Sequence, residues 1–436
     1  MLTPVLEEDV RPAPGGSSTT GLHSPTPTRT SDPRSRPLGP ENPAPSPATP
    51  AAPLPESEPA RRRYHEVDLL RFLAAIAVVG FHYLFRASVE DPAFALTGFT
   101  DPGGIFRYGY LGVDLFFVIS GFVILNSAWK KRPSAFVASR IARLYPAFWM
   151  ACTITAVVLL LDPNQRFEIT AEKYVYNLTM APKLFDMGLI DGVYWTLLIE
   201  LKFYLLILVL CVIGMTLNRV LGFAVGWLAL SIWDKFAPLP KTLDGLLVPE
   251  WAPYFAAGIL FALVARQGWR KRYAVPLLVA GGWAVYISTE LSRKQSDSYH
   301  TNLSPYVVGG VVAGIFVLFA LIASHKLQAR WTARVAFLGG LTYPLYLLHQ
   351  YIGFVLFNLG YGRMPRWLLL AGVVTIVVAL SWLLHVTVEE RCAAPLARWL
   401  RAKWETVRTV ALSTHPIEDV HNRQWSTPSS SVARIY

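Results

Sequence analysis

Two ionisable side chains, Arg71 and His82, lie in one long apolar segment of the sequence. They are eleven residues apart, so in an α-helix they share one face with about 20° of angular drift and lie roughly 16 Å apart along the axis. A neutral imidazole can take a proton from a hydroxyl group near pH 7, and an arginine can bind an anionic group. A structural interpretation also stays open, in which Arg71 pairs with Asp68 and His82 hydrogen-bonds a neighbouring helix.

A second pair of basic residues, Arg140 and Arg143, follows a predicted helix start at Pro133 and Ser134. Their spacing puts both side chains on one face of that helix, close to the inner membrane surface. Two guanidinium groups at this depth suit a phosphate ligand, because each arginine offers several rigid donors. The alternative is that they are flanking charges that orient the segment in the membrane.

Three further titratable residues, Asp114, Glu200 and His349, lie inside other apolar segments. Counted from the segment ends, they reach about the same depth as His82, in the outer half of the bilayer. Ionisable groups in lipid are costly, so this convergence favours a site, although a structural polar network could also produce it. In such a site, Asp114 or Glu200 could orient His82, as carboxylates orient histidines in many enzymes.

The composition indicates that lipid is the solvent for most of the chain, with 53% hydrophobic residues, 16% charged residues and a mean hydropathy of +0.37. The apolar residues gather into runs near the roughly 20 residues that cross a bilayer, which excludes one large soluble core. The net charge of +11 lies mainly in short loops, so it indicates topology and not nucleic-acid binding. Three scattered cysteines predict neither a disulfide framework nor a metal site.

These runs predict an all-α fold, a polytopic transmembrane helical bundle of about ten helices. The segment from 162 to 191 is the longest expected external loop, and it either covers a polar acceptor or is simply a solvated loop. The helices are expected at 66–86, 107–128, 135–161, 192–214, 219–236, 250–266, 273–290, 304–323, 335–358 and 367–389.

Three regions are predicted along the chain. Residues 1–60 are rich in Pro, Ser, Thr and Gly, so we expect a disordered cytoplasmic tail. Residues 61–398 form the transmembrane domain, and 399–436 a cytoplasmic C-terminal tail. Arg61 to Arg63 precede the first apolar run and place the N-terminus in the cytoplasm, and an even helix count returns the C-terminus there. No cleavable signal peptide opens the chain, so the first apolar segment is expected to stay as a helix. We expect a multi-pass protein of the cell membrane.

The same segments resemble the acyltransferase 3 family of membrane O-acyltransferases, from about Tyr64 to Pro395 and in the expected order. Arg71 and His82 match its pattern of an arginine, ten residues and a histidine. One departure is Thr196, where the family more usually has serine. The other matching segments are 109–122 (GYLGVDLFFVISGF), 140–146 (RIARLYP), 195–200 (WTLLIE) and 342–349 (TYPLYLLH).

The resemblance implies transfer of an acyl group, such as acetyl, from cytoplasmic acyl-CoA to a hydroxyl group of a carbohydrate, glycolipid or glycosylated metabolite. It implies that His82 is the catalytic base or a transient acyl carrier. With His82, we expect Asp114, Glu200 and His349 to form the catalytic group. It also implies that the acyl donor is bound by Arg71, Arg140 and Arg143.

No tightly bound cofactor is expected, since acyl-CoA is a substrate. We also see no appended SGNH-type domain, so the membrane domain is expected to complete the transfer itself. The main alternative is a multi-pass transporter or proton-coupled channel, because intramembrane Arg, His and Glu residues also form relays and substrate paths. Neither an inverted repeat nor paired broken helices support that reading. A sensory or scaffolding role would account for the Pro-rich tail but not for the buried charges.

Overall fold

The computed structural model describes residues 64–86, 104–129, 131–163, 167–327, 332–335 and 337–414. Within these ranges every regular element is a helix and none is a strand, which confirms the predicted all-α fold. The predicted tail, residues 1–60, lies outside the described part of the chain, as does the end of the C-terminal segment.

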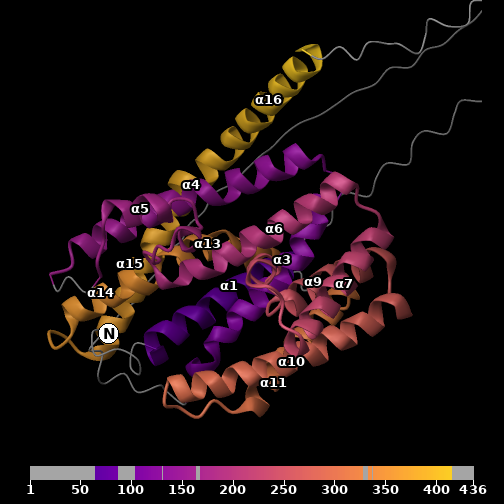
Figure 1. Ribbon diagram of the computed structural model, residues 1–436. Helices are drawn as coiled ribbons and strands as arrows, with labels where there is room; N and C mark the ends of the chain where they lie inside the picture. Colours follow the sequence, from indigo (N-terminus) through magenta and orange to yellow (C-terminus); the bar gives the residue numbers. More distant parts are fainter. Residues whose placement is uncertain are drawn as a thin grey trace, which may run out of the picture. The chain divides into compact units, whose positions relative to one another are not determined.

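Figure 1 shows the helices in their order along the chain. Several begin or end in short 3-10 or π-helical turns, which carry the label η. The elements are α1 (His65–Gly80), η1 (Phe81–Arg86), η3 (Phe106–Leu111), α3 (Gly112–Ala128), α4 (Pro133–Leu160), α5 (Ala171–Asn177), η4 (Pro182–Phe185), η5 (Gly192–Tyr194), α6 (Trp195–Ile213), α7 (Leu217–Phe236), α8 (Lys241–Leu247), α9 (Ala252–Gln267), α10 (Lys271–Ser298), α11 (Pro305–Ala323), α12 (Thr332–Val335), α13 (Leu338–Leu348), α14 (Gln350–Gly360), α15 (Arg366–Leu384), η6 (His385–Glu389) and α16 (Glu390–Thr414).

Eight helical segments in the described ranges are long and apolar enough to cross a membrane. They contain α1, α3, α4, α6, α9, α10, α11 and α15. The other two of the ten expected helices are also present, as α7 and as the pair α13 and α14. The chain is therefore a multi-pass membrane protein.

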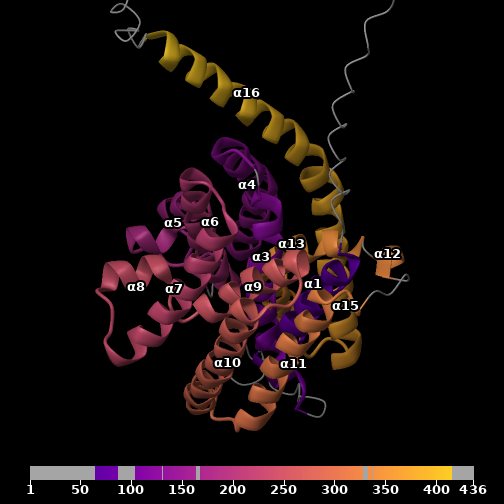
Figure 2. The same cartoon turned by 90° about the vertical axis from the view of Figure 1, so that its right-hand side faces the viewer.

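Helix α9 lies in the interior of the bundle. Every residue from Ala252 to Val264 is buried, as expected for a helix that is apolar on all sides. It packs against α3, α7, α10 and α11, and Figure 2 shows it surrounded by these neighbours. Helices α10 and α11 run side by side along one edge. The core of the bundle is thus formed by α3 and α9.

Helix α1 and the segment η3–α3 approach each other so closely that glycine is required at two positions. A Cβ atom on Gly109 would lie 2.1 Å from the carbonyl oxygen of Ala77, and one on Gly112 would lie 2.6 Å from that of Ala74. Small residues allow such backbone contact between helices in a membrane. This contact holds α1 beside the segment that carries Asp114.

The structure corrects one predicted element, because the helix expected at 335–358 is interrupted at His349. In a continuous helix the N–H of Tyr351 would donate to the carbonyl of Leu347. Instead it donates to the Asp191 carboxylate at 3.0 Å, while the Leu347 carbonyl accepts from the Tyr194 hydroxyl at 3.4 Å. Partners from the segment before α6 thus replace the helical hydrogen bond, and α13 ends at Leu348.

Candidate active site

His82 lies in η1, where α1 ends in a π-helical turn. Such turns are rare and often occur at functional sites, because they rotate side chains away from the regular helical positions. The ring is 7% exposed and lines a cavity of about 220 Å³. We call this the outer cavity. Its other polar or aromatic lining residues are Phe81, Arg86, Tyr110, Asp114, Trp195, Glu250, Trp251, Gln295, Tyr299, Tyr346 and Gln350.

Three residues that line the outer cavity each carry a buried polar atom that has no hydrogen-bond partner in the described part of the chain. These atoms are the Tyr110 hydroxyl, Oε1 of Gln295 and Oε1 of Gln350. A buried polar atom without a partner costs about 1–3 kcal/mol, so a ligand that supplied the missing hydrogen bonds would be favoured. The cavity is therefore suited to a ligand with several hydroxyl groups.

His82 contacts the second candidate histidine directly. Its Nδ1 lies 3.1 Å from Nε2 of His349 and 2.9 Å from the carbonyl oxygen of Val78. His349 is fully buried behind it, and its own Nδ1 faces the carbonyl oxygens of Tyr346 at 2.8 Å and Leu345 at 3.2 Å. The structure thus brings together two residues that are 267 positions apart.

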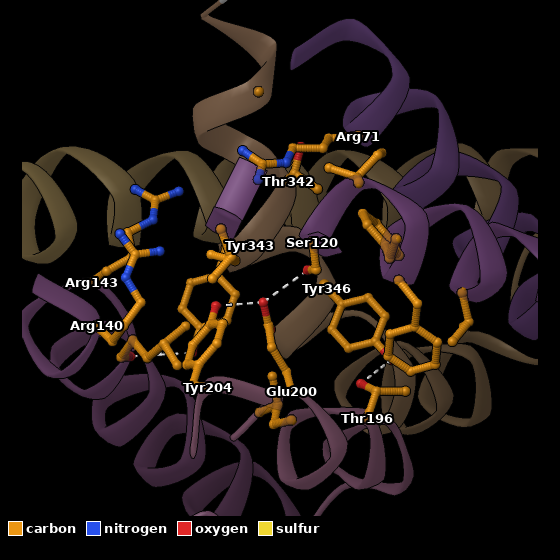
Figure 3. Close-up of a pocket in the computed structure, with 18 residues that line it drawn as sticks. Arg71, Ser120, Arg140, Arg143, Thr196, Glu200, Tyr204, Thr342, Tyr343 and Tyr346 are labelled. Atoms are coloured by element: carbon orange, nitrogen blue, oxygen red, sulfur yellow. Dashed lines mark hydrogen bonds between the residues drawn. The ribbon is translucent and has the colours of Figure 1, made fainter. Parts of the chain in front are cut away.

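The three candidate donor-binding arginines also come together, at a separate inner cavity of about 130 Å³. Arg71 comes from α1, and Arg140 and Arg143 come from α4. Glu200 of α6 lines the same cavity, where its carboxylate accepts from Tyr204 at 2.5 Å and from Ser120 at 3.1 Å. Figure 3 shows this carboxylate in the middle of the cavity, with Arg140 and Arg143 on one side and Arg71 above.

The arginines differ in their partners. Arg143 forms an ion pair with Glu389 of η6, a buried carboxylate that also contacts Nδ1 of His385 at 2.8 Å. Arg71 lies 3.9 Å from Asp68, the pairing that the alternative structural interpretation of the sequence proposed. Arg140 lies over an aromatic ring, with its guanidinium carbon 5.8 Å from the ring centre of Tyr204. An anionic ligand at Arg143 would therefore compete with Glu389.

The two cavities are neighbours, because Val113 and Tyr346 line both of them. The Tyr346 hydroxyl bonds to the Thr196 hydroxyl at 2.8 Å and to the Val193 carbonyl at 3.2 Å, which fixes its ring between them. Figure 3 shows Tyr346 and Thr196 at the side of the inner cavity opposite Arg140 and Arg143. Tyr346 and Val113 therefore lie between the cavity of the arginines and the cavity of His82.

Of the two carboxylates that the sequence interpretation placed level with His82, only Asp114 lines the same cavity as His82. Glu200 lines the arginine cavity and not the cavity of His82. Asp114 lines the outer cavity, and its carboxylate accepts from Ser288 at 3.5 Å. In the described part of the chain, the ring of His82 hydrogen-bonds to His349 and to the Val78 carbonyl and to neither carboxylate.

Sequence reasoning missed several residues that shape the site. Tyr346 lies within the matched segment 342–349, but only the structure places it between the cavities. Glu389 was assigned to the end of an apolar run, and its pairing with Arg143 depends on the packing of η6 against α4. Asp191 was counted as part of an external loop, although it is fully buried.

An all-α membrane bundle that joins an arginine-lined cavity to a histidine-lined cavity has the parts of a membrane-embedded group-transfer enzyme. The family model described as "Acyltransferase domain" matches residues 64–386, about three quarters of the chain. The chain therefore belongs to the acyltransferase 3 family, and it is a membrane O-acyltransferase.

Relatives with assigned names agree with this family. The chain is 24% identical over 374 residues to nodulation protein 10 of Rhizobium leguminosarum bv. viciae, covering 76% of this chain and 94% of the relative. It is 24% identical over 349 residues to a Komagataeibacter xylinus protein named as a proposed membrane-bound transacylase, covering 76% and 83%. A shorter match, 30% over 105 residues, covers 22% of this chain and 14% of the peptidoglycan O-acetyltransferase of Listeria monocytogenes. No solved structure matches the chain.

Proposed function

We propose that this enzyme transfers an acyl group from acyl-CoA, bound from the cytoplasm, to a hydroxyl group of a carbohydrate, glycolipid or glycosylated metabolite in the outer cavity. The observation that carries the proposal is the pair of neighbouring cavities, one lined by three arginines and the other by His82. The names of relatives point the same way, since one of them acts on peptidoglycan.

The inner cavity suits the donor. Coenzyme A carries phosphate groups and a slender pantetheine arm, and arginines bind phosphate through charge-assisted hydrogen bonds. Arg71, Arg140 and Arg143 surround one cavity of about 130 Å³, and we assign the pantetheine arm to this cavity. The nucleotide would stay at the cytoplasmic mouth, and the thioester would pass Val113 and Tyr346 towards His82.

The outer cavity suits a hydroxylated acceptor. Its three buried polar atoms without partners, on Tyr110, Gln295 and Gln350, can exchange hydrogen bonds with sugar hydroxyl groups. Its aromatic side chains, including Trp195 and Trp251, provide apolar faces of the kind that pack against a sugar ring.

The chemistry follows from a neutral His82. Its ring accepts the proton of the acceptor hydroxyl while the hydroxyl oxygen attacks the thioester carbonyl carbon. A new C–O bond forms, the C–S bond breaks, and the proton passes from His82 to the leaving sulfur of coenzyme A. Direct transfer of this kind needs donor and acceptor present together. An acyl group carried by His82 would instead form before the acceptor binds.

The test is release of the coenzyme A thiol by the purified protein in lipid nanodiscs. Acetyl-CoA and longer acyl-CoA donors are supplied with sugar or glycolipid acceptors, and the product is identified by mass spectrometry. We expect thiol release that depends on the acceptor, with a matching gain of acyl mass. Absence of both, with every donor and acceptor class tried, would count against the proposed donor and acceptor.

A further inference from the structure

The hydrogen bonds of His349 fix which of its ring nitrogens carries the proton. Its Nδ1 faces two carbonyl oxygens of its own helix, those of Tyr346 and Leu345, at 2.8 and 3.2 Å. A carbonyl oxygen only accepts hydrogen bonds, so Nδ1 must be the protonated nitrogen. In a neutral imidazole this leaves Nε2 with a lone pair and no proton.

That lone pair sets the tautomer of His82 in turn. Nδ1 of His82 lies between two acceptors, Nε2 of His349 at 3.1 Å and the Val78 carbonyl at 2.9 Å. Facing two lone pairs, it must be the proton donor. The other nitrogen, Nε2, then carries the lone pair, and it has no partner in the described part of the chain. His82 lines the outer cavity, so this is the nitrogen available to a ligand.

A neutral residue suits the position of His349, next to Nδ1 of His82, better than a carboxylate does. His349 is 0% exposed, and an ionised group without a partner there would carry a large desolvation cost. Neutral imidazole avoids that cost. When His82 takes a proton and becomes charged, its Nδ1–H becomes a stronger donor to the same lone pair. His349 can therefore stabilise the charged ring without itself being charged.

The backbone around His349 holds this ring in place. The helix is interrupted at His349, and the carbonyl oxygen of His349 accepts a hydrogen bond from the Tyr83 hydroxyl at 2.5 Å. Asp191 fixes the following turn through the N–H of Tyr351. Tyr83 lies next to His82 in η1, so the hydrogen bond between Tyr83 and His349 fixes the backbone at His349 relative to that at His82.

We propose that His349 is a positioning residue that holds His82 in the Nδ1–H tautomer, so that Nε2 faces the substrate as the proton acceptor. This role rests on the proposed function of His82 as the base. His349 itself touches neither donor nor acceptor, since it does not line either cavity.

The first test reads the tautomer without acyl transfer. The full chain is labelled with ¹⁵N-histidine and studied in lipid nanodiscs by nuclear magnetic resonance, and the His82 signals are assigned by their loss in His82→Asn. We expect a protonated Nδ1 and an unprotonated Nε2 at neutral pH. A wild-type His82 protonated at Nε2 would overturn the inference even if the enzyme is active.

The second test uses two substitutions of His349. His349→Phe keeps a ring but removes the acceptor, and we expect kcat to fall about ten- to a hundredfold with little change in the KM for acyl-CoA. In this variant the Val78 carbonyl is the remaining acceptor, so the His82 signal should shift. His349→Gln offers Oε1 as a replacement acceptor, and we expect it to recover much of kcat and the wild-type signal.

The outcomes separate this inference from the proposed function. Full activity of His349→Phe, beside an inactive His82→Ala, would refute the positioning role and leave His82 as the base. Equal losses in the Phe and Gln variants, with an unchanged His82 signal in both, would also refute it, because packing alone would then explain the loss. Full activity of His82→Ala would instead refute the proposed function.

Discussion

His82 is the residue on which the proposed chemistry depends, and its removal gives the first prediction. His82→Ala should lower acyl transfer by about 10²–10⁴-fold, the range typical of general acid–base catalysis. Coenzyme A binding should be unchanged, because the arginines line a different cavity. Thiol release measures the first quantity and calorimetric titration with coenzyme A the second.

The matched control is His300→Asn. His300 is exposed, lines neither cavity and has a positive φ of 48°, which asparagine tolerates. It should keep wild-type turnover. A correctly folded His82→Ala with near-normal turnover at saturating acyl-CoA would exclude His82 as the base.

Substitution of an arginine of the inner cavity should weaken coenzyme A binding and leave turnover nearly unchanged, the opposite of the His82→Ala result. Arg71→Ala should raise the dissociation constant for coenzyme A by about ten- to a hundredfold, because one charge-assisted hydrogen bond contributes about 1.5–3 kcal/mol. Turnover at saturating donor should change much less, since Arg71 lies at the other cavity from His82. Arg398→Ala, an exposed arginine of α16, is the control for loss of charge. Unchanged coenzyme A affinity in Arg71→Ala would remove Arg71 from the donor site.

For single residues, the sequence identified candidate site residues but did not predict which of them contact one another. Helical spacing alone grouped Arg140 with Arg143, and the structure places both at one cavity with Arg71. Depth counting put Glu200 level with His82, but depth says nothing of which way a side chain points around its helix. The contact between His82 and His349 depends on how α1 packs beside the end of α13, which one sequence does not contain.

At the scale of elements, the interruption at His349 depends on one buried carboxyl group. Asp191 accepts from the N–H groups of Val193 and Tyr351, at 3.1 and 3.0 Å. Burial raises the pKa of this carboxyl to about 7, although these two hydrogen bonds and the charge of Arg86 lower it. The folded protein therefore holds a proton that the unfolded chain releases near pH 4.

This linkage predicts how stability depends on pH. Protonation of Asp191 should contribute about 4 kcal/mol to the free energy of unfolding. This contribution should be fully present below about pH 4 and should be lost as pH rises to about 7. Asp191→Asn cannot ionise but keeps an acceptor for the N–H of Val193, so its stability should lack this pH-dependent contribution. The midpoint of thermal unfolding, measured from pH 4 to 8, should fall more steeply in the wild type. Parallel curves for the two proteins would contradict the assignment.

Periodicity and length predicted most helices correctly, because a segment in lipid must satisfy its own backbone hydrogen bonds. The segment that contains η3 and α3 is an example, since residues 107–128 were expected and Phe106–Ala128 is observed. The exception is the helix expected at 335–358. Its interruption comes from Asp191 and Tyr194, which lie about 150 residues earlier, so no local pattern could reveal it.

For the whole molecule, the Pro-rich N-terminal region gives a prediction about activity. The family match begins only at residue 64, and residues 1–55 have a composition rich in Pro, Ser, Thr and Gly that offers no core. Deletion of residues 1–55 should therefore leave acyl transfer within about twofold of wild type, provided that Arg61 to Arg63 remain to orient the first helix. Thiol release by the truncated protein checks this. A folded but inactive truncation would assign the region a role in catalysis.

The proposed mechanism depends on the orientation of the bundle, because the proposed donor, acyl-CoA, is cytoplasmic and the mechanism requires the arginine cavity to open on that side. Positive charge in short loops predicts that Lys131, Arg270 and Arg401 lie in the cytoplasm, and alternation along the helices then puts Asp186 and Ser296 outside. Cysteine residues introduced singly at these five positions, in a variant without Cys152, Cys211 and Cys392, can be labelled in intact cells by a reagent that does not cross the membrane. We expect labelling at Asp186→Cys and Ser296→Cys and, at the other three, only after the membrane is permeabilised.

If Arg270→Cys were labelled in intact cells while Lys131→Cys was not, an odd number of helices would cross between them. Labelling of Lys131→Cys itself would put Arg140 and Arg143 at the external face, where acyl-CoA does not reach them, and the assignment of donor and acceptor cavities would fail.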